Sequence, residues 1–172
     1  MLTLQRVTPT DISLLDGLVQ LLIDVVDGGA SVGFLDPLPP ATARRYWEQV
    51  LASLGEGLAM WVAMVDERVV GTVQLAPCLK DNGRHRADLQ KLQVLNAYRG
   101  QGVSSRLMDA AEDFARHNRR TLLVLDTLVG SDAEFVYRHR GWTKAGEIPC
   151  FAADSQGKLH PTAYYYKLLA AG

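Results

Sequence analysis

Arg99-Gly100-Gln101-Gly102-Val103-Ser104 is the stretch of sequence that decides the fold. It lies between residues 88–95, which have the apolar character of a strand, and residues 104–117, whose apolar side chains recur at helical spacing. A glycine-containing turn from a strand into a helix collects free backbone N–H groups, and the helix start adds partial positive charge. The turn therefore predicts a binding site for an anionic group of a ligand.

The spacing of the two glycines excludes the common nucleotide-binding loops. The turn contains neither Gly-x-x-x-x-Gly-Lys-Ser/Thr nor Gly-x-Gly-x-x-Gly followed by a ribose-binding acid. The expected ligand is therefore phosphorylated, but it is neither an ordinary nucleoside triphosphate nor a dinucleotide. A tight turn that binds nothing uses the same residue types, so the surroundings of the turn must decide between the two interpretations.

The composition predicts one folded domain, residues 1–172, built around one core. Apolar residues make up 48% and charged residues 22%, and the net charge of −1 gives no reason to expect nucleic acid or an anionic membrane as a partner. No apolar run is long enough to span a bilayer, and residues 1–10 lack the pattern of a signal peptide, so a cytoplasmic location is expected. Two cysteines and four histidines show no metal-binding spacing, and no metal is expected.

The hydrophobic pattern along the chain predicts a mixed α/β fold. Strands are expected over residues 2–7, 58–65, 69–75, 88–95, 121–125, 142–148 and 163–169, and helices over 11–26, the segment after Pro39-Pro40, 104–117 and 132–139. The front half has the pattern of antiparallel strands, and the glycine turn implies a parallel crossover.

The strand, the turn and the helix together resemble the Gcn5-related N-acetyltransferase (GNAT) superfamily, whose turn has the pattern Arg/Gln-x-x-Gly-x-Gly/Ala. Arg99 and Gly102 match this pattern, and Ser104 stands in place of the last small residue. A second feature of the family follows in Ala133-Glu134-Phe135-Val136-Tyr137 and Gly141-Trp142. The resemblance implies the GNAT fold, an α/β (α+β) arrangement with a mixed, mostly antiparallel seven-stranded sheet flanked by about four helices.

Several further segments are similar to the tabtoxin-resistance branch of this family, which acetylates an amino-acid-like toxin. These segments are residues 28–34 (GGASVGF), 94–108, 125–127, 146–147 and 159–163 (LHPTA). The first and the last are not general features of the family, so this similarity is fairly specific.

The resemblance implies that acetyl-CoA is the co-substrate, with its pyrophosphate on the glycine turn and its acetyl group near the backbone of one strand. The implied cofactor-binding residues are Leu92, Val94, Arg99, Gly100, Gln101, Gly102, Val103, Ser104 and Ser105. The two-residue period of a strand puts residues 88, 90, 92 and 94 on one face. Lys91 and Gln93 then face the other side, where a structural role is expected.

Acetyl transfer to an amine needs a group that receives the proton of the amine and a group that stabilises the departing thiolate. Asp88 points toward the acceptor side of its strand, Asp126 ends the next strand, and the resemblance aligns both with carboxylates of an acceptor pocket. We hypothesise that the two receive the ammonium group and its proton; a solvated carboxylate or a strand-end turn residue is the alternative. Tyr137 is the candidate acid for the thiolate, and an aromatic core residue is its alternative.

The loop over residues 28–34 lies where the family builds a wall of the acceptor site, so Ser31 and Phe34 are candidate acceptor contacts; a simple helix terminator is the alternative. His160, in the LHPTA segment, is a further candidate. The expected activity is transfer of acetyl to a small amino-acid-like amine by direct attack, with detoxification of a tabtoxinine-β-lactam-like compound as its expected role. A protein N-terminal or lysine acetyltransferase, which needs an open groove, and a non-catalytic acyl-CoA sensor, which needs only the turn, are the alternatives. A homodimer through the C-terminal strands stays open, with no residue that argues for it.

Overall fold

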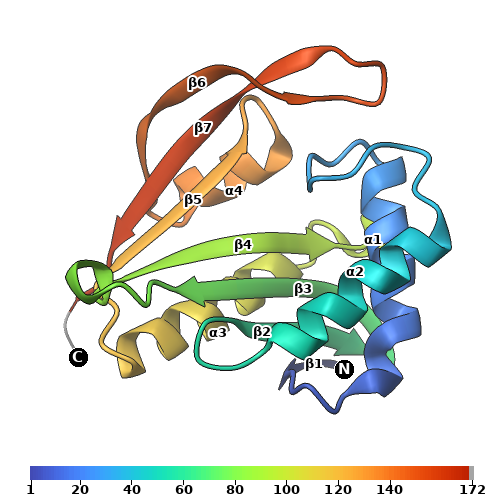
Figure 1. Ribbon diagram of the computed structural model, residues 1–172, viewed down its shortest axis with the longest axis horizontal. Coiled ribbons are helices and arrows are strands. Elements are labelled where there is room, and N and C mark those ends of the chain that lie inside the picture. The colour runs from blue at the N-terminus through green and yellow to red at the C-terminus, as the bar shows by residue number, and fades with distance from the viewer. Residues whose placement is uncertain (171–172) are drawn as a thin grey trace.

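A computed structural model describes residues 1–170, and its centre is one seven-stranded sheet in the order β1-β2-β3-β4-β5-β7-β6 (Figure 1). The strands are β1 (Leu2–Arg6), β2 (Ala59–Val65), β3 (Arg68–Pro77), β4 (Arg86–Val94), β5 (Leu122–Leu128), β6 (Thr143–Ala153) and β7 (Leu159–Leu168). The helices are α1 (Leu15–Asp27), α2 (Pro40–Ser53), α3 (Val103–His117) and α4 (Asp132–His139). The predicted mixed, mostly antiparallel sheet with four flanking helices is confirmed.

The helices form a layer on each face of the sheet. α1 and α2 cover one face of β3 and β4, while α3 packs under β1 to β4 on the other face and α4 packs against β5 (Figure 1). Gly71 allows the close approach of α3, because a Cβ atom there would lie 2.9 Å from the carbonyl oxygen of Gln93 and 3.0 Å from Val103 Cγ1. α3 therefore starts at a position fixed by its packing on β3. None of the helices within residues 1–170 is both long enough and apolar enough to cross a membrane.

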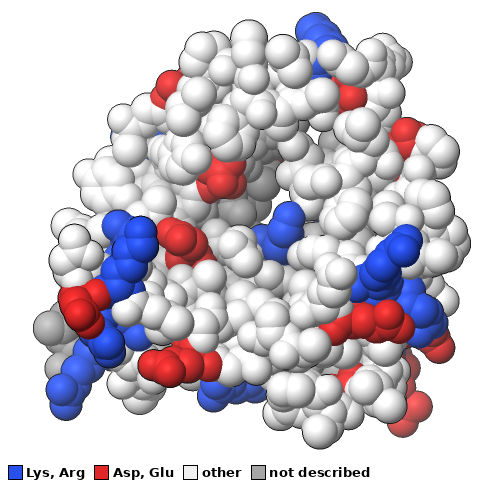
Figure 2. Space-filling view, in the orientation of Figure 1, with Lys and Arg blue, Asp and Glu red and all other residues white. Residues whose placement is uncertain are grey.

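The two parallel strands at the centre of the sheet separate after a short contact. β4 and β5 pair only where Arg86–Asp88 lies beside Leu122–Val124, and every other strand pair is antiparallel. Beyond this contact β5, β7 and β6 diverge from β4, so that the sheet opens like a wedge (Figure 1). Figure 2 shows a hollow between these two parts, with acidic and basic side chains at its edge.

A β-bulge in β4 changes which side chains face this opening. Gln90 pairs with Gln74 and Gln93 pairs with Thr72, so three steps along β4 match two along β3. The extra residue lies at Lys91 or beside it, and Lys91 has a φ of +53°, in the left-handed region. Gln93 therefore shares the face of Asp88 and Gln90, and Val94 lies on the α3 face with Leu89. The prediction that residues 88 to 94 alternate without interruption was wrong.

The far walls of the opening are the loop between α1 and α2 and the long β6–β7 hairpin. The backbone N–H of Asp36, in the loop, donates to Ser155 Oγ at the hairpin turn over 3.0 Å. These two segments lie 119 residues apart in the sequence. Their contact joins the helical side of the opening to the β6–β7 side.

Candidate active site

The start of α3 has the geometry of an anion site. Gly102 is the N-cap residue with a φ of +78°, Gly100 has a φ of +72°, and neither has any atom within 4 Å of the position a Cβ would take. Within the described residues the helix start has no side-chain cap and no acidic residue in its first turn. The first N–H groups of the helix are thus left for a ligand, and the surface is open for a bulky phosphate group.

The predicted cofactor-binding residues follow one another from β4 to the first turn of α3. Arg99, Gly100, Gln101 and Gly102 are exposed, Leu92, Val94, Ser104 and Ser105 are half-buried, and Val103 is buried. The side chain of Gln101 donates to the carbonyl oxygen of Ala97 over 3.0 Å, which stiffens the turn. The side chain of Val103 packs toward Gly71 on β3, so only its backbone is available to a ligand.

Asp88 and Asp126 lie on the same face of the sheet at the point where β4 and β5 separate. Asp88 pairs with Val124, two residues before Asp126, and both carboxylates face the side of α1 and α2. Partial burial raises the pKa of Asp88; Arg86 lowers it and the negative charge of Asp126 raises it again. Asp126 Oδ2 accepts a hydrogen bond of 3.0 Å from Thr162 Oγ1. The two predicted carboxylates therefore lie close enough for the charge of Asp126 to act on Asp88.

Lys91 lies in the same place, although the sequence suggested a structural role on the other side. Its Nζ donates to the carbonyl oxygen of Val32 over 2.7 Å and lies 5.9 Å from the ring centroid of Tyr46. Burial lowers the pKa of Lys91, and the charge of Asp126 partly opposes this effect. The sequence carried no signal for this placement, because it depends on the bulge.

Tyr137 lies on the face of the sheet opposite to Asp126, because it packs against Tyr165, whose strand partner is Leu125. It lies on α4, is 6% exposed, and packs against Trp142 and Tyr165 at centroid distances of 5.9 and 6.5 Å. Burial raises its pKa, and the charge of Asp126 raises it further. The hydroxyl thus stays protonated at neutral pH and is able to donate a proton or a hydrogen bond.

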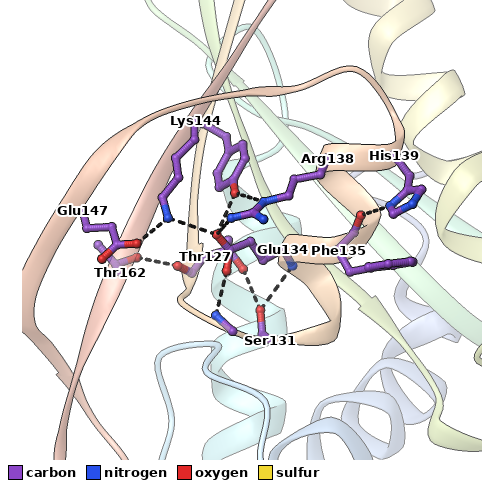
Figure 3. A network of polar contacts seen from close by, with 11 residues as sticks. Thr127, Ser131, Glu134, Phe135, Arg138, His139, Lys144, Glu147 and Thr162 are labelled. Atoms are coloured by element: carbon purple, nitrogen blue, oxygen red, sulfur yellow. Dashed lines mark hydrogen bonds and ion pairs between the residues drawn. The ribbon is translucent and has the colours of Figure 1, made fainter.

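A polar network holds α4, and with it Tyr137, in place (Figure 3). At its centre is Glu134, which accepts hydrogen bonds from Tyr165 Oη at 2.6 Å, from Arg138 at 3.1 Å and from the Gly130 N–H at 2.7 Å. Lys144 of β6 lies 3.5 Å from the same carboxylate. The hydrogen bond from Tyr165 is the main reason why the pKa of Glu134 falls from 4.5 to about 2.

Glu134 was not among the predicted site residues, although the sequence carried a signal for it. Ser131 and Glu134 have the spacing of a capping box, and Ser131 Oγ accepts from the Glu134 N–H over 3.3 Å. A pKa of about 2 in place of 4.5 corresponds to about 3 kcal/mol at most. Screening by solvent at the exposed Arg138 side of the network reduces this to about 1–2 kcal/mol.

The predicted acceptor contacts lie in the two far walls. Phe34 packs edge-on against Tyr46, with centroids 5.1 Å apart, and Ser31 is exposed in the same loop. His160 Nε2 lies 2.8 Å from Asp154 Oδ2, and this contact is the main reason for the lowered pKa of Asp154. The contacts of His160 thus lie within the β6–β7 hairpin that it stabilises.

Other parts of the surface have no connection with these residues. Two hollows of about 370 and 240 Å³ lie near the end of β1 and the start of β2, around Arg6, Gly55 and Ala59, and no predicted site residue lines either of them. Within residues 1–170, no group of three or more His, Cys, Asp or Glu side chains is placed to hold a metal ion.

The glycine turn, the wedge between β4 and β5, and the tyrosine on α4 define the class of acetyltransferases of the GNAT fold. A sequence model of the acetyltransferase (GNAT) family matches residues 30–142, which include the turn, both carboxylates and Tyr137. The chain belongs to this family. It is also 33% identical over 117 residues to N-acetyltransferase 8B of Homo sapiens, a match that covers 67% of this chain and 52% of that protein.

Solved structures agree with the fold. An N-acetyltransferase of Staphylococcus aureus Mu50 superimposes with a TM-score of 0.80 at 13% identity, over 99% of both chains. A protein of Salmonella typhimurium described as an acetyltransferase, solved with its cofactor acetyl-CoA, superimposes with a TM-score of 0.77 at 14% identity, over 99% of this chain and 95% of that one. The chain spans about half the length of the curated relatives that it matches.

Proposed function

We propose that this chain is an acetyl-CoA-dependent N-acetyltransferase that acts on the amine of a small amino-acid-like molecule. The observation that carries the proposal is that Asp88 and Asp126 lie on the same sheet face where β4 and β5 separate, close enough for the charge of Asp126 to raise the pKa of Asp88, in an opening whose far walls touch. A polypeptide acceptor needs an open groove, whereas the contact of Asp36 with Ser155 bridges the acceptor side. This bridge favours a small molecule over a protein N-terminus or a lysine side chain.

The residues at the start of α3 suit the cofactor. The open glycine turn and the uncapped N–H groups of the helix would hold the pyrophosphate of acetyl-CoA, which itself supplies the acetyl group as an activated thioester. Leu92 and Val94 lie on the β4 side of the wedge, and their backbone would flank the thioester. The half-buried Ser104 and Ser105 add hydroxyl donors at the same end of the helix.

The two carboxylates have the chemistry to activate the amine. An amine with a pKa of ~10.4 is neutral in only about one molecule in 10³ near pH 7.4, which costs roughly 4 kcal/mol. Asp126 and Asp88 would bind the ammonium form and accept its proton, directly or through water, as the nitrogen attacks the acetyl carbon. The raised pKa of Asp88 suits this role, because a carboxylate with a higher pKa is a stronger base.

Tyr137 would complete the transfer. As the new C–N bond forms and the C–S bond breaks, Tyr137 Oη would donate its proton to the departing sulfur and later regain one from solvent. After the attack the nitrogen is positively charged and loses its second proton, and both amine protons reach solvent by way of the carboxylates, so the products are the N-acetylated acceptor and the free thiol of CoA. The raised pKa of Tyr137 keeps the phenol protonated until that moment.

The acceptor class that we propose comes from the similarity of residues 28–34 and 159–163 to the tabtoxin-resistance branch of the family. Acetylation of a tabtoxinine-β-lactam-like amino acid in the cytoplasm would remove the positive charge of its amine, and detoxification would follow. The loop over residues 28–34 supplies the carbonyl that holds Lys91, which supports a role for this loop as part of the acceptor wall.

A thiol-release assay tests this proposal. Acetyl-CoA is offered with free amino acids, amino-acid-like β-lactams, aminoglycosides, polyamines and peptides. Release with a small amino-acid-like amine that is lost in Asp126→Asn would support the proposal. Release with peptides alone would overturn the small-molecule assignment, and tight binding of acetyl-CoA without release for any acceptor would favour a non-catalytic sensor.

A further inference from the structure

Lys91 occupies an unusual position for a lysine. It has a φ of +53° at the bulge of β4, a backbone conformation that L residues rarely adopt and that persists only where the surroundings enforce it. Its Nζ donates to the carbonyl oxygen of Val32 over 2.7 Å. A Cβ at Gly33 would lie 3.3 Å from this Nζ, so the loop passes close to the ammonium group. The bulge and the loop thus fix the ammonium group of Lys91 between the wall of the acceptor side and the start of the wedge.

The contacts of this ammonium group are incomplete. A lysine ammonium group has three N–H donors. Within residues 1–170, Val32 supplies the only protein acceptor for those of Lys91. The buried side-chain amides of Gln74 and Gln93, at either end of the bulge, also have atoms without a partner among the described residues: the nitrogen of both and the oxygen of Gln93. Buried polar atoms without a partner cost free energy, so the donors of Lys91, Gln74 and Gln93 on this strand face favour a bound group that accepts hydrogen bonds.

The charges around Lys91 are arranged in a complementary way. Asp126 is close enough to influence both Lys91 and Asp88, yet no ion pair within 4.0 Å joins Lys91 to either carboxylate in the described part of the chain. The opening therefore presents one fixed positive charge and a pair of negative charges that do not neutralise each other. A zwitterion, with an ammonium group beside a carboxylate, matches this pattern.

We propose that Lys91 binds the carboxylate of the acceptor, so that the acceptor is an amino acid with a free carboxylate next to its reacting amine. This inference rests on the proposed function, because it concerns the same acceptor site. In this arrangement the ammonium group of the acceptor lies at Asp88 and Asp126. The carboxylate of the acceptor lies at Lys91, under the loop over residues 28–34. A peptide N-terminus and a simple amine both lack this carboxylate and leave the ammonium of Lys91 without its second partner.

The test compares each proteinogenic L-amino acid with its carboxamide, which keeps the amine and removes the negative charge. The quantity measured is the ratio of kcat/KM for the acid to kcat/KM for the amide. In Lys91→Met this ratio should fall by about tenfold to a hundredfold, because a charge-assisted hydrogen bond is lost. Lys91→Arg should restore most of the ratio, and the KM for acetyl-CoA should stay the same in both variants. The exposed Lys80→Met serves as the matched control.

The outcomes separate this inference from the proposed function. Equal use of acids and amides by the wild type, or an unchanged ratio in Lys91→Met, would overturn the role of Lys91 and leave the acetyltransferase standing. If no small amine is acetylated, the proposed function fails, and calorimetry of the same amino acids with CoA-saturated protein decides the inference. Binding that weakens by about tenfold in Lys91→Met supports the carboxylate site, and no binding overturns it.

Discussion

Replacing Asp126 with asparagine isolates one negative charge at the candidate active site. Asparagine keeps the shape of the side chain, and its Oδ1 still accepts the 3.0 Å hydrogen bond from Thr162. The side chain is exposed, so the free energy of unfolding should change by less than about 0.5 kcal/mol. Any large effect on catalysis then comes from the charge itself.

The expected loss follows from what Asp126 contacts in the proposed complex. A hydrogen bond between an ammonium group and a carboxylate contributes about 1.5–3 kcal/mol, which corresponds to a fall of roughly 10- to 150-fold in kcat/KM for the amine. The KM for acetyl-CoA should not change, since the cofactor lies at the turn after β4. The pKa of Asp88 should fall, because Asp126 raises it in the wild type, and the acidic limb of the pH profile should move to lower pH.

Steady-state kinetics between pH 5 and 10 with the best acceptor of the panel would measure both effects. Asp113→Asn is the matched control, because Asp113 is an exposed carboxylate on α3 that pairs with Arg116. A kcat/KM for Asp126→Asn within about twofold of the wild type at every pH would refute the role of this carboxylate. A parallel fall in acetyl-CoA affinity would show that the substitution disturbs the fold of the wedge, contrary to the reasoning.

Three further perturbations probe other parts of the site. Tyr137→Phe should lower kcat by about 10²-fold or more while acetyl-CoA binding stays the same, because only the proton donor is lost. An unchanged kcat would count against Tyr137 as the proton donor to the thiolate. Gly102→Ala should weaken acetyl-CoA binding and lower the unfolding free energy by about 1–2 kcal/mol, since φ is +78°, whereas Gly55→Ala should do neither. Glu134→Gln should lower the unfolding free energy by about 1–2 kcal/mol at pH 7. Because the pKa of Glu134 lies below its unfolded value of 4.5, this difference should shrink as the pH falls toward 2 in urea denaturation, and a constant difference would contradict the assignment.

The order of the elements and the glycine turn were predictable because they depend on local patterns. Alternation of apolar residues gave the strands, helical spacing gave α1 to α4, and Gly102 fixed the start of α3 because only glycine readily adopts its φ of +78°. The parallel contact of β4 with β5 followed from the helix that connects them.

The side chains that face the wedge were less predictable, because a bulge shifts the phase of a strand without a mark in the sequence. Lys91 adopts a positive φ although it is not glycine, so neither its conformation nor the reversal of Gln93 and Val94 follows from a two-residue period. The contact of Asp36 with Ser155 depends on packing across 119 residues, which no local pattern encodes.

The separation of β4 from β5 explains how residues on opposite faces of one sheet can serve a single reaction. In a continuous sheet the side chains of Asp126 and Tyr137 would be kept apart by paired backbone, with α4 on one side and α1 on the other. Here the strands pair only as far as Asp88, and the charge of Asp126 raises the pKa of Tyr137 on the other face. In the proposed reaction the amine would lose its proton on the face of the two carboxylates, and the sulfur would gain one from the face of α4. The acetyl group would move directly from the sulfur of CoA to the amine, so the proposed reaction requires no covalent intermediate on the protein. The two cysteines fit this view, because Cys78 lies after the end of β3 beside Arg86 and Cys150 is exposed on β6.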